Sequence, residues 1–389
     1  MSRRFPYRGS SLKSGSFLKR LGLIAFGFLL GLALVEAALR VWTNPFGYRV
    51  KGDQIVLPVH AQYIVRTDDN PKVDPLIVHT KNSLGFRGPE PPVPWEDHLT
   101  ILTIGGSTTE QLYISDGLTW TERLAEGLAK NFPALWINNA GFVGHSTYGH
   151  QVLLDDVVSR LQPDLVIYLV GANELGLTDF GPFDQAAGAD PSTWQGLVNW
   201  MSLHSETAAL FQNFHRAMQA RRLQYVGGNL ELDTLPVRPL TPEEIEQALA
   251  GFQGEPLESY RIRLTRLIVS TRLAGIEPVL VTQPALYGDA VDPTTGVDLD
   301  QVEFYGKHSA AEWAVLELYN DVTREVAAAE GVFLIDLAAL MPKDSQYYRD
   351  MIHYTNSGSA LVAEILYLPL CEFLAAGFAK PENTCENTR

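Results

Sequence analysis

Short runs of apolar and β-branched residues alternate with helical patterns over most of this 389-residue chain. The runs predict five strands, at Leu99–Ile104, Trp136–Ala140, Asp164–Val170, Pro278–Gln283 and Val332–Asp336. Between them, apolar residues recur at helical spacing, and Thr119 and Glu122 form a capping-box pattern ahead of one such stripe. This alternation is typical of a parallel sheet covered by helices on both faces. The sequence therefore predicts a three-layer α/β/α sandwich around a five-stranded parallel sheet.

A long apolar segment near the N-terminus precedes this pattern. Leu21 to Val35 include no charged residue, and the apolar character continues to Trp42. At about 1.5 Å per residue, a helix over 21–42 is roughly 33 Å long, enough to cross a bilayer core of about 30 Å. Residues 1–20 include six basic residues and no acidic one, which predicts a cytoplasmic N-terminus and an extracytoplasmic, periplasmic body.

Two questions about this segment stay open in the sequence. A cleaved signal peptide with its site at Val35-Glu36-Ala37 is the alternative to an uncleaved anchor. The anchor is favoured because the apolar run is longer than the core of a signal peptide. Glu36 and Arg40 are four residues apart near the far end of the segment, and they form either a pair at the membrane interface or a functional charge within the membrane.

Charge and cysteine content exclude several classes of protein. The chain has 30 basic and 45 acidic residues, and without the six bases of residues 1–20 the net charge falls from −15 to −21. Such a body repels phosphate backbones, so no nucleic-acid partner is predicted. Two cysteines, Cys371 and Cys385, are too few for a disulfide-dense scaffold or a four-thiolate metal site. Outside the cytoplasm they can form one disulfide, or Cys371 can be a small apolar residue of the last helix.

The composition divides the rest of the chain. Residues 43–98 are rich in Pro, Asp, Asn and Gly and are predicted to form a stalk and lead-in. The predicted main domain covers 99–376, and residues 377–389 form a C-terminal tail. An insertion at about 176–255 separates the third and fourth strands, and segments of this length are often functional lids or partner surfaces.

Four short motifs follow strands or lie near the C-terminus. Gly105-Gly106-Ser107 allows a sharp turn that exposes a hydroxyl, although such turns also cap helices or bind phosphate. Asp350 and His353 are spaced so that one turn brings a carboxylate beside an imidazole, in a triad or in a surface ion pair. Asn173 can donate its amide to an oxyanion or occupy a turn. Gly144 can expose a backbone N–H or simply form a turn.

Together these motifs indicate one site. In a doubly wound sheet of order 2-1-3-4-5, the first and third strands end side by side at the switch point, with the second strand beside them. Ser107, Gly144 and Asn173 are then expected in one crevice, which Asp350 and His353 can reach from beyond the fifth strand. Other chemistry has less support: His145 and His150 lack a metal-ligand pattern, and no P-loop occurs, so we expect no metal and no cofactor.

The four blocks resemble those of the SGNH (GDSL-type) hydrolase superfamily, which includes esterases, lipases and carbohydrate acetylesterases, over roughly residues 99–376. The resemblance implies a flavodoxin-like fold in which Ser107 is the nucleophile, with Asp350 and His353 as its triad partners. It also implies an oxyanion hole formed by Ser107, Gly144 and Asn173, with Gly141 as an alternative to Gly144.

Two positions depart from the family pattern. Gly106 stands where an aspartate is usual, and Glu174 replaces the aspartate that usually follows the block-three asparagine. The upstream run from Asn82 to Gly88 is similar to a lead-in of membrane-anchored bacterial members.

The expected function is an extracytoplasmic serine esterase that is held to the membrane by its N-terminal helix and acts on acyl esters, above all O-acetyl esters of small molecules or polysaccharide. Acyl transfer to a sugar hydroxyl on envelope or exported polysaccharide is an alternative, because the same acyl-enzyme can react with either acceptor. A catalytically silent glycan-binding or assembly module on the same fold is a second alternative.

Overall fold

The computed structural model describes residues 14–41, 50–52, 54–67, 72–180, 184, 193–222, 231–378 and 381–386. At its centre lies a parallel sheet of five strands: β5 (Leu99–Gly105), β6 (Leu135–Asn139), β7 (Leu165–Leu169), β8 (Glu277–Val281) and β11 (Phe333–Ile335). They are arranged in the order β11-β8-β7-β5-β6. Counted along the chain, this is the predicted order 2-1-3-4-5, and the predicted strand limits are correct to within two residues.

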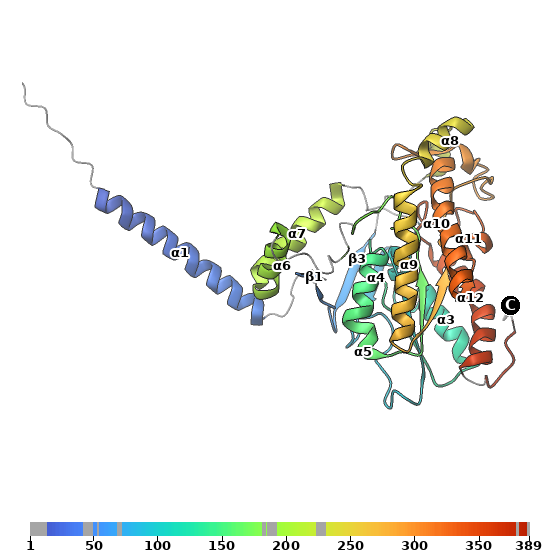
Figure 1. Ribbon diagram of the computed structural model, residues 1–389, viewed down its shortest axis with the longest axis horizontal. Helices are drawn as coiled ribbons and strands as arrows, with labels where there is room; N and C mark the ends of the chain where they lie inside the picture. The colour runs from blue at the N-terminus through green and yellow to red at the C-terminus, as the bar shows by residue number, and fades with distance from the viewer. Residues whose placement is uncertain are drawn as a thin grey trace, which may run out of the picture.

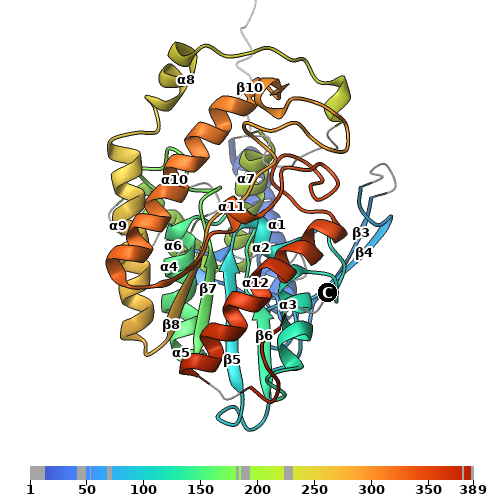
Figure 2. The ribbon, with the colours of Figure 1, turned by 90° about the vertical axis from the view of Figure 1, so that its right-hand side faces the viewer.

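Helices cover both faces of this sheet, which confirms the three-layer sandwich (Figures 1 and 2). One face is covered by α3 (Trp120–Ala129), α11 (Leu337–Leu340) and α12 (Asn356–Gly377). The other is covered by α4 (Thr147–Leu153), a π-helical turn (Leu154–Val158), α5 (Ser159–Leu161), α9 (Glu255–Leu273) and α10 (Ser309–Glu330). Successive strand residues alternate between the two cores: Ile101 packs toward α3 and α12, and Leu102 packs toward α9 and α10.

The predicted capping box begins α3. The Thr119 side chain accepts from the Glu122 backbone, and the Glu122 carboxylate accepts from the Thr119 N–H. α12 is apolar enough to be scored as a membrane span, with a mean hydropathy of 1.7, but it lies in the core with Leu366 and Leu370 fully buried.

The segment between the N-terminal helix and the sheet forms small hairpins and then joins the sheet edge. β1 (Val50–Lys51) pairs with β2 (Gln54–Ile55), and β3 (Gln62–Arg66) pairs with β4 (Leu76–Thr80). Arg87 then exchanges two backbone hydrogen bonds with Asn139 at the end of β6, at 3.0 and 2.8 Å. The lead-in predicted from Asn82 to Gly88 is thereby attached to the sheet next to the carboxyl ends of its strands.

The N-terminal helix α1 (Ser14–Val41) extends away from the sandwich (Figure 1). Its candidate membrane span is Lys19–Val41, with a mean hydropathy of 2.2; its most apolar stretch is exposed, whereas Leu39 near its end is buried. Arg40 donates to Glu36 at 2.9 Å, so the predicted pair forms. The first thirteen residues of the predicted basic leader and Trp42 lie outside the described residues.

The predicted insertion contributes α6 (Trp194–His204), α7 (Glu206–Arg222), a 3-10 turn (Leu232–Thr234) and α8 (Pro242–Leu249). α6 and α7 lie beside the end of α1, whereas α8 lies beside α10 (Figure 1). Residues 181–183, 185–192 and 223–230 of the insertion are outside the described part of the chain. The remaining short elements are α2 (Ser107–Glu110), a 3-10 turn (Leu299–Gln301), β9 (Glu303–Phe304) and β10 (Lys307–His308).

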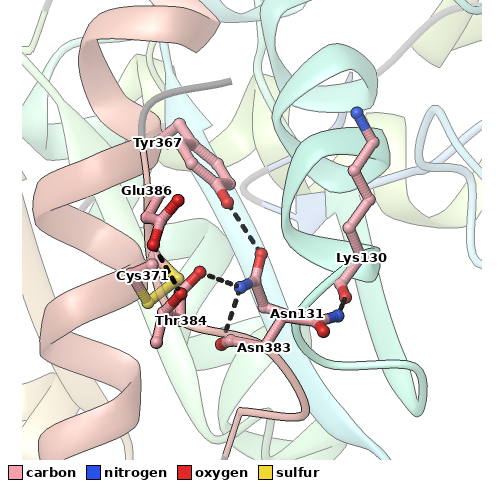
Figure 3. Close-up of a disulfide and its surroundings, with 8 residues drawn as sticks. Lys130, Asn131, Tyr367, Cys371, Asn383, Thr384 and Glu386 are labelled. Carbon is pink, nitrogen blue, oxygen red and sulfur yellow. Dashed lines mark hydrogen bonds between the residues drawn. A yellow bond between two sulfur atoms is a disulfide. The ribbon is translucent and has the colours of Figure 1, made fainter.

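Cys371 and Cys385 form a disulfide, which decides between the two readings of these cysteines (Figure 3). The bond joins buried α12 to the C-terminal tail, with the two Cα atoms 5.8 Å apart. Asn131 fixes the approach of the tail, because its side-chain amide donates to the carbonyls of Asn383 and Thr384 at 3.0 and 3.1 Å. Tyr367 of α12 in turn donates to the Asn131 side chain at 2.7 Å.

Removing this disulfide should measurably destabilise the protein. The two cysteines are 14 residues apart, and closing a loop of this length stabilises by about 3 kcal/mol through chain entropy. We expect Cys385→Ser to lower the free energy of unfolding by about this amount in denaturant titrations of the detergent-solubilised chain. Wild-type protein treated with a thiol reductant is the control and should match the variant. Equal stability of oxidised wild type and variant would contradict the prediction.

Candidate active site

The turn after β5 presents Ser107 at the first position of α2. Gly106 precedes it and leaves no room for a side chain, because an added Cβ would lie 2.2 Å from the Asn173 amide nitrogen. At this position, where the family usually has an aspartate, glycine allows the Asn173 side chain to approach the turn closely.

The structure brings Ser107, His353 and Asp350 together. The His353 Nε2 atom lies 2.8 Å from the Ser107 Oγ atom, although 246 residues separate them in the sequence. The His353 Nδ1 atom lies 2.8 and 2.9 Å from the two carboxylate oxygens of Asp350. A donor at Nδ1 leaves Nε2 free to accept a proton from the serine hydroxyl, as general-base chemistry needs.

A tight turn holds the carboxylate and the imidazole in this arrangement. Asp350 accepts hydrogen bonds from the backbone N–H groups of Ile352 at 3.0 Å and His353 at 2.9 Å. The Arg349 N–H donates to the His353 carbonyl at 2.7 Å and closes the turn. The spacing of three residues thus places both groups of the pair through local backbone geometry.

Asp350 stays ionised in a largely buried position. Burial alone would raise its pKa, but the charge and hydrogen bond of His353, the guanidinium of Arg349 and the Ile352 N–H together hold the pKa well below its usual range. Arg349 is itself buried, contacts Asp350 at 3.0 Å and lies over the ring of Tyr113 at 4.1 Å. A permanent negative charge at Asp350 stabilises the imidazolium that forms when His353 takes a proton.

The predicted oxyanion donors lie around the same turn. Asn173 packs against Gly106, and its amide donates to the His145 carbonyl at 2.9 Å. Gly144 has a φ of 77°, a left-handed conformation that favours glycine. Val143, its neighbour, lines the same cavity as Ser107. Among the hydrogen bonds of the described residues, none is donated by the backbone N–H of Ser107 or Gly144.

Gly141, the alternative to Gly144 as an oxyanion donor, has a different structural role. Its N–H already donates to the Asn139 side chain at 2.9 Å. A Cβ at this position would lie 2.4 Å from the Glu110 nitrogen, so Gly141 allows the loop to pass directly against α2. These two facts favour Gly144 over Gly141 as the donor.

Two buried carboxylates support the loop that carries Gly144. Glu110, at the end of α2, is fully buried and accepts from the Val143 N–H at 2.7 Å. Glu174, next to Asn173, accepts from the Thr147 N–H at 2.6 Å and the Thr147 hydroxyl at 2.9 Å, and Arg263 contacts it at 3.1 Å. The loop is therefore fixed from the nucleophile side and from the Asn173 side.

Arg87 supports the segment that follows Ser107. Its buried guanidinium donates to the carbonyls of Glu110 and Gln111 at 2.9 Å and of Ile114 at 2.8 Å, and it pairs with Asp116 at 2.9 Å. The lead-in thus holds one wall of the site in place.

A small cavity of about 100 Å³ opens at the Ser107 hydroxyl. It is lined by Ser107, Thr108, Gln111, Leu112, Tyr113, Ile114, Val143, Arg349, His353 and Tyr354. For scale, an apolar protein cavity of about 150 Å³ accommodates benzene. A small group bound at the Ser107 hydroxyl would occupy this cavity.

Sequence reasoning did not identify Arg87, Glu110 or Arg349 as parts of this site. Arg87 lies within the Asn82–Gly88 run that resembles the family lead-in, and Arg349 directly precedes the predicted aspartate. Both residues therefore adjoin a motif that can be recognised in the sequence. Glu110 offered no such signal, because an acidic residue three positions after a candidate nucleophile reads as an ordinary helix residue.

The fold agrees with the comparison to known proteins. The chain belongs to the GDSL-like lipase/acylhydrolase family, whose pattern matches residues 103–361, and it is a serine ester hydrolase. No curated protein matches the chain.

Solved structures of esterases resemble the chain distantly. The acetyl xylan esterase AlAXEase is 17% identical with a TM-score of 0.39, over 69% of this chain and 97% of that one. The acetylxylan esterase Axe2 of Geobacillus stearothermophilus is 14% identical with a TM-score of 0.38, over 72% and 94%. The lipase/acylhydrolase of Enterococcus faecalis is 16% identical with a TM-score of 0.38, over 73% and 100%. Likenesses this distant do not bear on the substrate.

The environment of Glu174 predicts a pH-dependent contribution to stability. Burial raises its pKa to about 7 from 4.5, and Asp184 acts in the same direction, while Arg263 and Thr147 oppose the shift. A carboxyl whose folded pKa is raised stabilises the fold fully below the unfolded pKa, and this contribution is lost as the pH rises through the folded pKa. We expect the thermal midpoint of wild type, relative to Glu174→Gln, to fall between about pH 4.5 and pH 7.

The measurement is circular dichroism melting of the two proteins across this pH range. Glu96→Gln, at an exposed position, controls for the loss of one charge. Parallel profiles of wild type and Glu174→Gln would show that Glu174 does not titrate in this window.

Proposed function

We propose that this ester hydrolase uses Ser107, His353 and Asp350 as a catalytic triad to remove short acyl groups, chiefly O-acetyl groups, from a substrate outside the cytoplasm. The observation that carries the proposal is the continuous contact from the Asp350 carboxylate through the His353 ring to the Ser107 hydroxyl, with 2.8 Å at each step. These groups meet at the mouth of a cavity suited to a small acyl chain.

The reaction follows from this arrangement. His353 takes the proton from Ser107 as the Ser107 oxygen attacks the ester carbonyl, and the resulting imidazolium is stabilised by Asp350. The tetrahedral intermediate collapses when His353 returns the proton to the leaving alcohol, which gives an acyl-enzyme on Ser107. Water, deprotonated by His353, then attacks the acyl-enzyme and releases the acid.

The negative charge of the tetrahedral intermediate needs donors. The N–H groups of Ser107 and Gly144 and the side-chain amide of Asn173 are proposed for this task. Support comes from the two unengaged N–H groups and from the contact between Asn173 and Gly106, directly before the nucleophile. Because Asn173 also donates to the His145 carbonyl, its amide is held in place before substrate arrives.

The proposed location is a single membrane anchor with the N-terminus in the cytoplasm and the catalytic domain in the periplasm. Three observations support it: the exposed apolar span Lys19–Val41, the basic residues before it, and the disulfide between Cys371 and Cys385. Disulfides form and persist in oxidising compartments, so the last observation favours translocation independently of the span.

The triad proposal is tested with Ser107→Ala. We expect the variant to lose both labelling by a fluorophosphonate and hydrolysis of p-nitrophenyl acetate, because it lacks the proposed nucleophile. In a panel of p-nitrophenyl esters, wild type should prefer acetate and propionate over long acyl chains, as the cavity volume requires. Ser159→Ala, which removes a hydroxyl that donates to the Asp155 carbonyl at 3.1 Å, is the matched control.

Labelling of Ser107→Ala at the wild-type rate would remove the nucleophile assignment. An active wild type that transfers the acyl group to an added glycan, rather than to water, would identify an acyltransferase. A wild type inert toward every ester and toward the fluorophosphonate would instead favour a silent binding module.

The oxyanion assignment is tested with Asn173→Ala. Removing one oxyanion donor typically lowers kcat by about 10²–10³-fold, and we expect an effect of this size with little change in KM. The thermal midpoint of the variant should be compared with wild type, since Asn173 also contacts His145. An unchanged kcat in a folded variant would exclude Asn173 from the oxyanion hole.

A further inference from the structure

The pair of helices α6 and α7 is built with its apolar side outward. The exposed side chains lie at helical spacing on each helix: Trp194, Leu197 and Trp200 on α6, and Phe211, Phe214 and Met218 on α7. Their exposure ranges from 39% for Met218 to 75% for Trp194. Amphipathic surface helices of globular proteins direct this face to the core instead.

The side between the two helices includes buried polar side chains beside Ala209. Asn199 and Ser202 of α6 and Gln212 of α7 are buried there. Gln212 donates to the Asn199 side chain at 2.9 Å and accepts from the backbone N–H of Gly52 at 3.2 Å. A pair that buries hydrogen-bonded amides and exposes tryptophan and phenylalanine suits surroundings that are themselves apolar.

Hydrogen bonds join the α6–α7 pair to the end of the apolar span in α1. The Glu36 carboxylate of α1 accepts from the N–H groups of Glu206 and Thr207 at 3.0 Å, and thereby caps the first turn of α7. It also accepts from the Ser205 and Thr207 hydroxyls at 2.9 Å. Arg40, one turn further along α1, donates to the His204 carbonyl between the two helices at 3.0 Å.

We propose that α6 and α7 lie in the outer surface of the same bilayer that α1 crosses, with their exposed apolar face in contact with lipid. This inference rests on the proposed membrane anchor. Lipid is favoured over a protein partner because Glu36 and Arg40, in the last turns of the span, bond the residues that join α6 to α7, so the helix pair lies directly at the end of the span. Tryptophan is also the residue type enriched at the membrane–water interface.

Two further features agree with an interfacial position. In Figure 1, α7 runs across the direction of α1 and not alongside it, as expected of a helix that lies in the membrane plane beside a spanning helix. By sequence, the C-terminal half of α7 contains three arginines and no acidic residue, a composition that anionic lipid surfaces attract.

The contact has a consequence for the catalytic domain. Lys51 pairs with Glu206 of α7, and Gly52 is packed so closely that an added Cβ would lie 2.6 Å from the Leu203 side chain. Since residues 50–52 lead into the domain, the α6–α7 pair holds that domain in a set orientation to the bilayer instead of leaving it on a free tether.

The test uses variants of the full chain that each add one cysteine, because both native cysteines are in the disulfide and the new thiol is the one that reacts. Trp200→Cys and Phe214→Cys are labelled with bimane and reconstituted in vesicles of phosphatidylcholine and phosphatidylglycerol, with or without acyl-chain bromination. Leu30→Cys reports on the span. Leu273→Cys, on α9 and 84% exposed, reports on the body. Hydrolysis of p-nitrophenyl acetate confirms that each variant is folded.

We expect brominated lipid to quench the labels at 30, 200 and 214 strongly and to leave the label at 273 unchanged. Quenching at 30 without quenching at 200 and 214 would overturn the inference and leave the anchor intact. Quenching at 200 and 214 without quenching at 30 would support a surface-bound pair and remove the spanning anchor. Quenching at none of the three positions would overturn both.

Discussion

The contact between His353 and Ser107 depends on the order of the strands. A loop beyond β11 and a turn after β5 have no local reason to meet, since 246 residues separate the two side chains. They meet because all five strands are parallel and their carboxyl ends form one edge, with β5 in the interior of the sheet. The pairing of the strands thus brings the Ser107 hydroxyl and the His353 ring to within 2.8 Å of each other, although the two residues are far apart in the sequence. A rearrangement of the strands would separate Ser107, His353 and Asp350 without altering any of them.

Around this contact, the site is stiffened by polar groups buried next to reacting ones. Glu110, Glu174 and Arg87 are all buried, and each forms at least one hydrogen bond with a backbone group of the segments around Ser107, Gly144 and Asn173. Burying such charges is costly unless they are paired, and the backbone partners reduce that cost while they limit loop motion. An oxyanion hole works only if its donors are in place before charge develops. These buried polar groups thus hold the proposed oxyanion donors in place, whereas an apolar core would stabilise the fold more.

The sequence predicted those parts of the structure that follow from local pattern. β7 was predictable because Leu165–Leu169 is a fully buried apolar run, and the Asp350–His353 pair because one backbone turn forms it. Arg87 and Glu110 were not predictable, because their partners are backbone groups of distant loops. The sequence alone did not decide whether the two cysteines form a disulfide. The bond depends on the path of the tail, which Asn131 directs from another part of the chain.

The α6–α7 pair shows a different limit of prediction from sequence. Helical periodicity reveals that one face is apolar, but it does not reveal whether that face points to a core or to a bilayer. The burial of Gln212 and Asn199 against each other resolves the direction, since amides that hydrogen bond within a pair leave the apolar face outside. The carboxylate of Glu36 then links this pair to the span, where an unpaired charge would be expensive and a charge that caps a helix is compensated. Glu36 thus caps the first turn of α7, and the same hydrogen bonds compensate its own charge near the membrane surface.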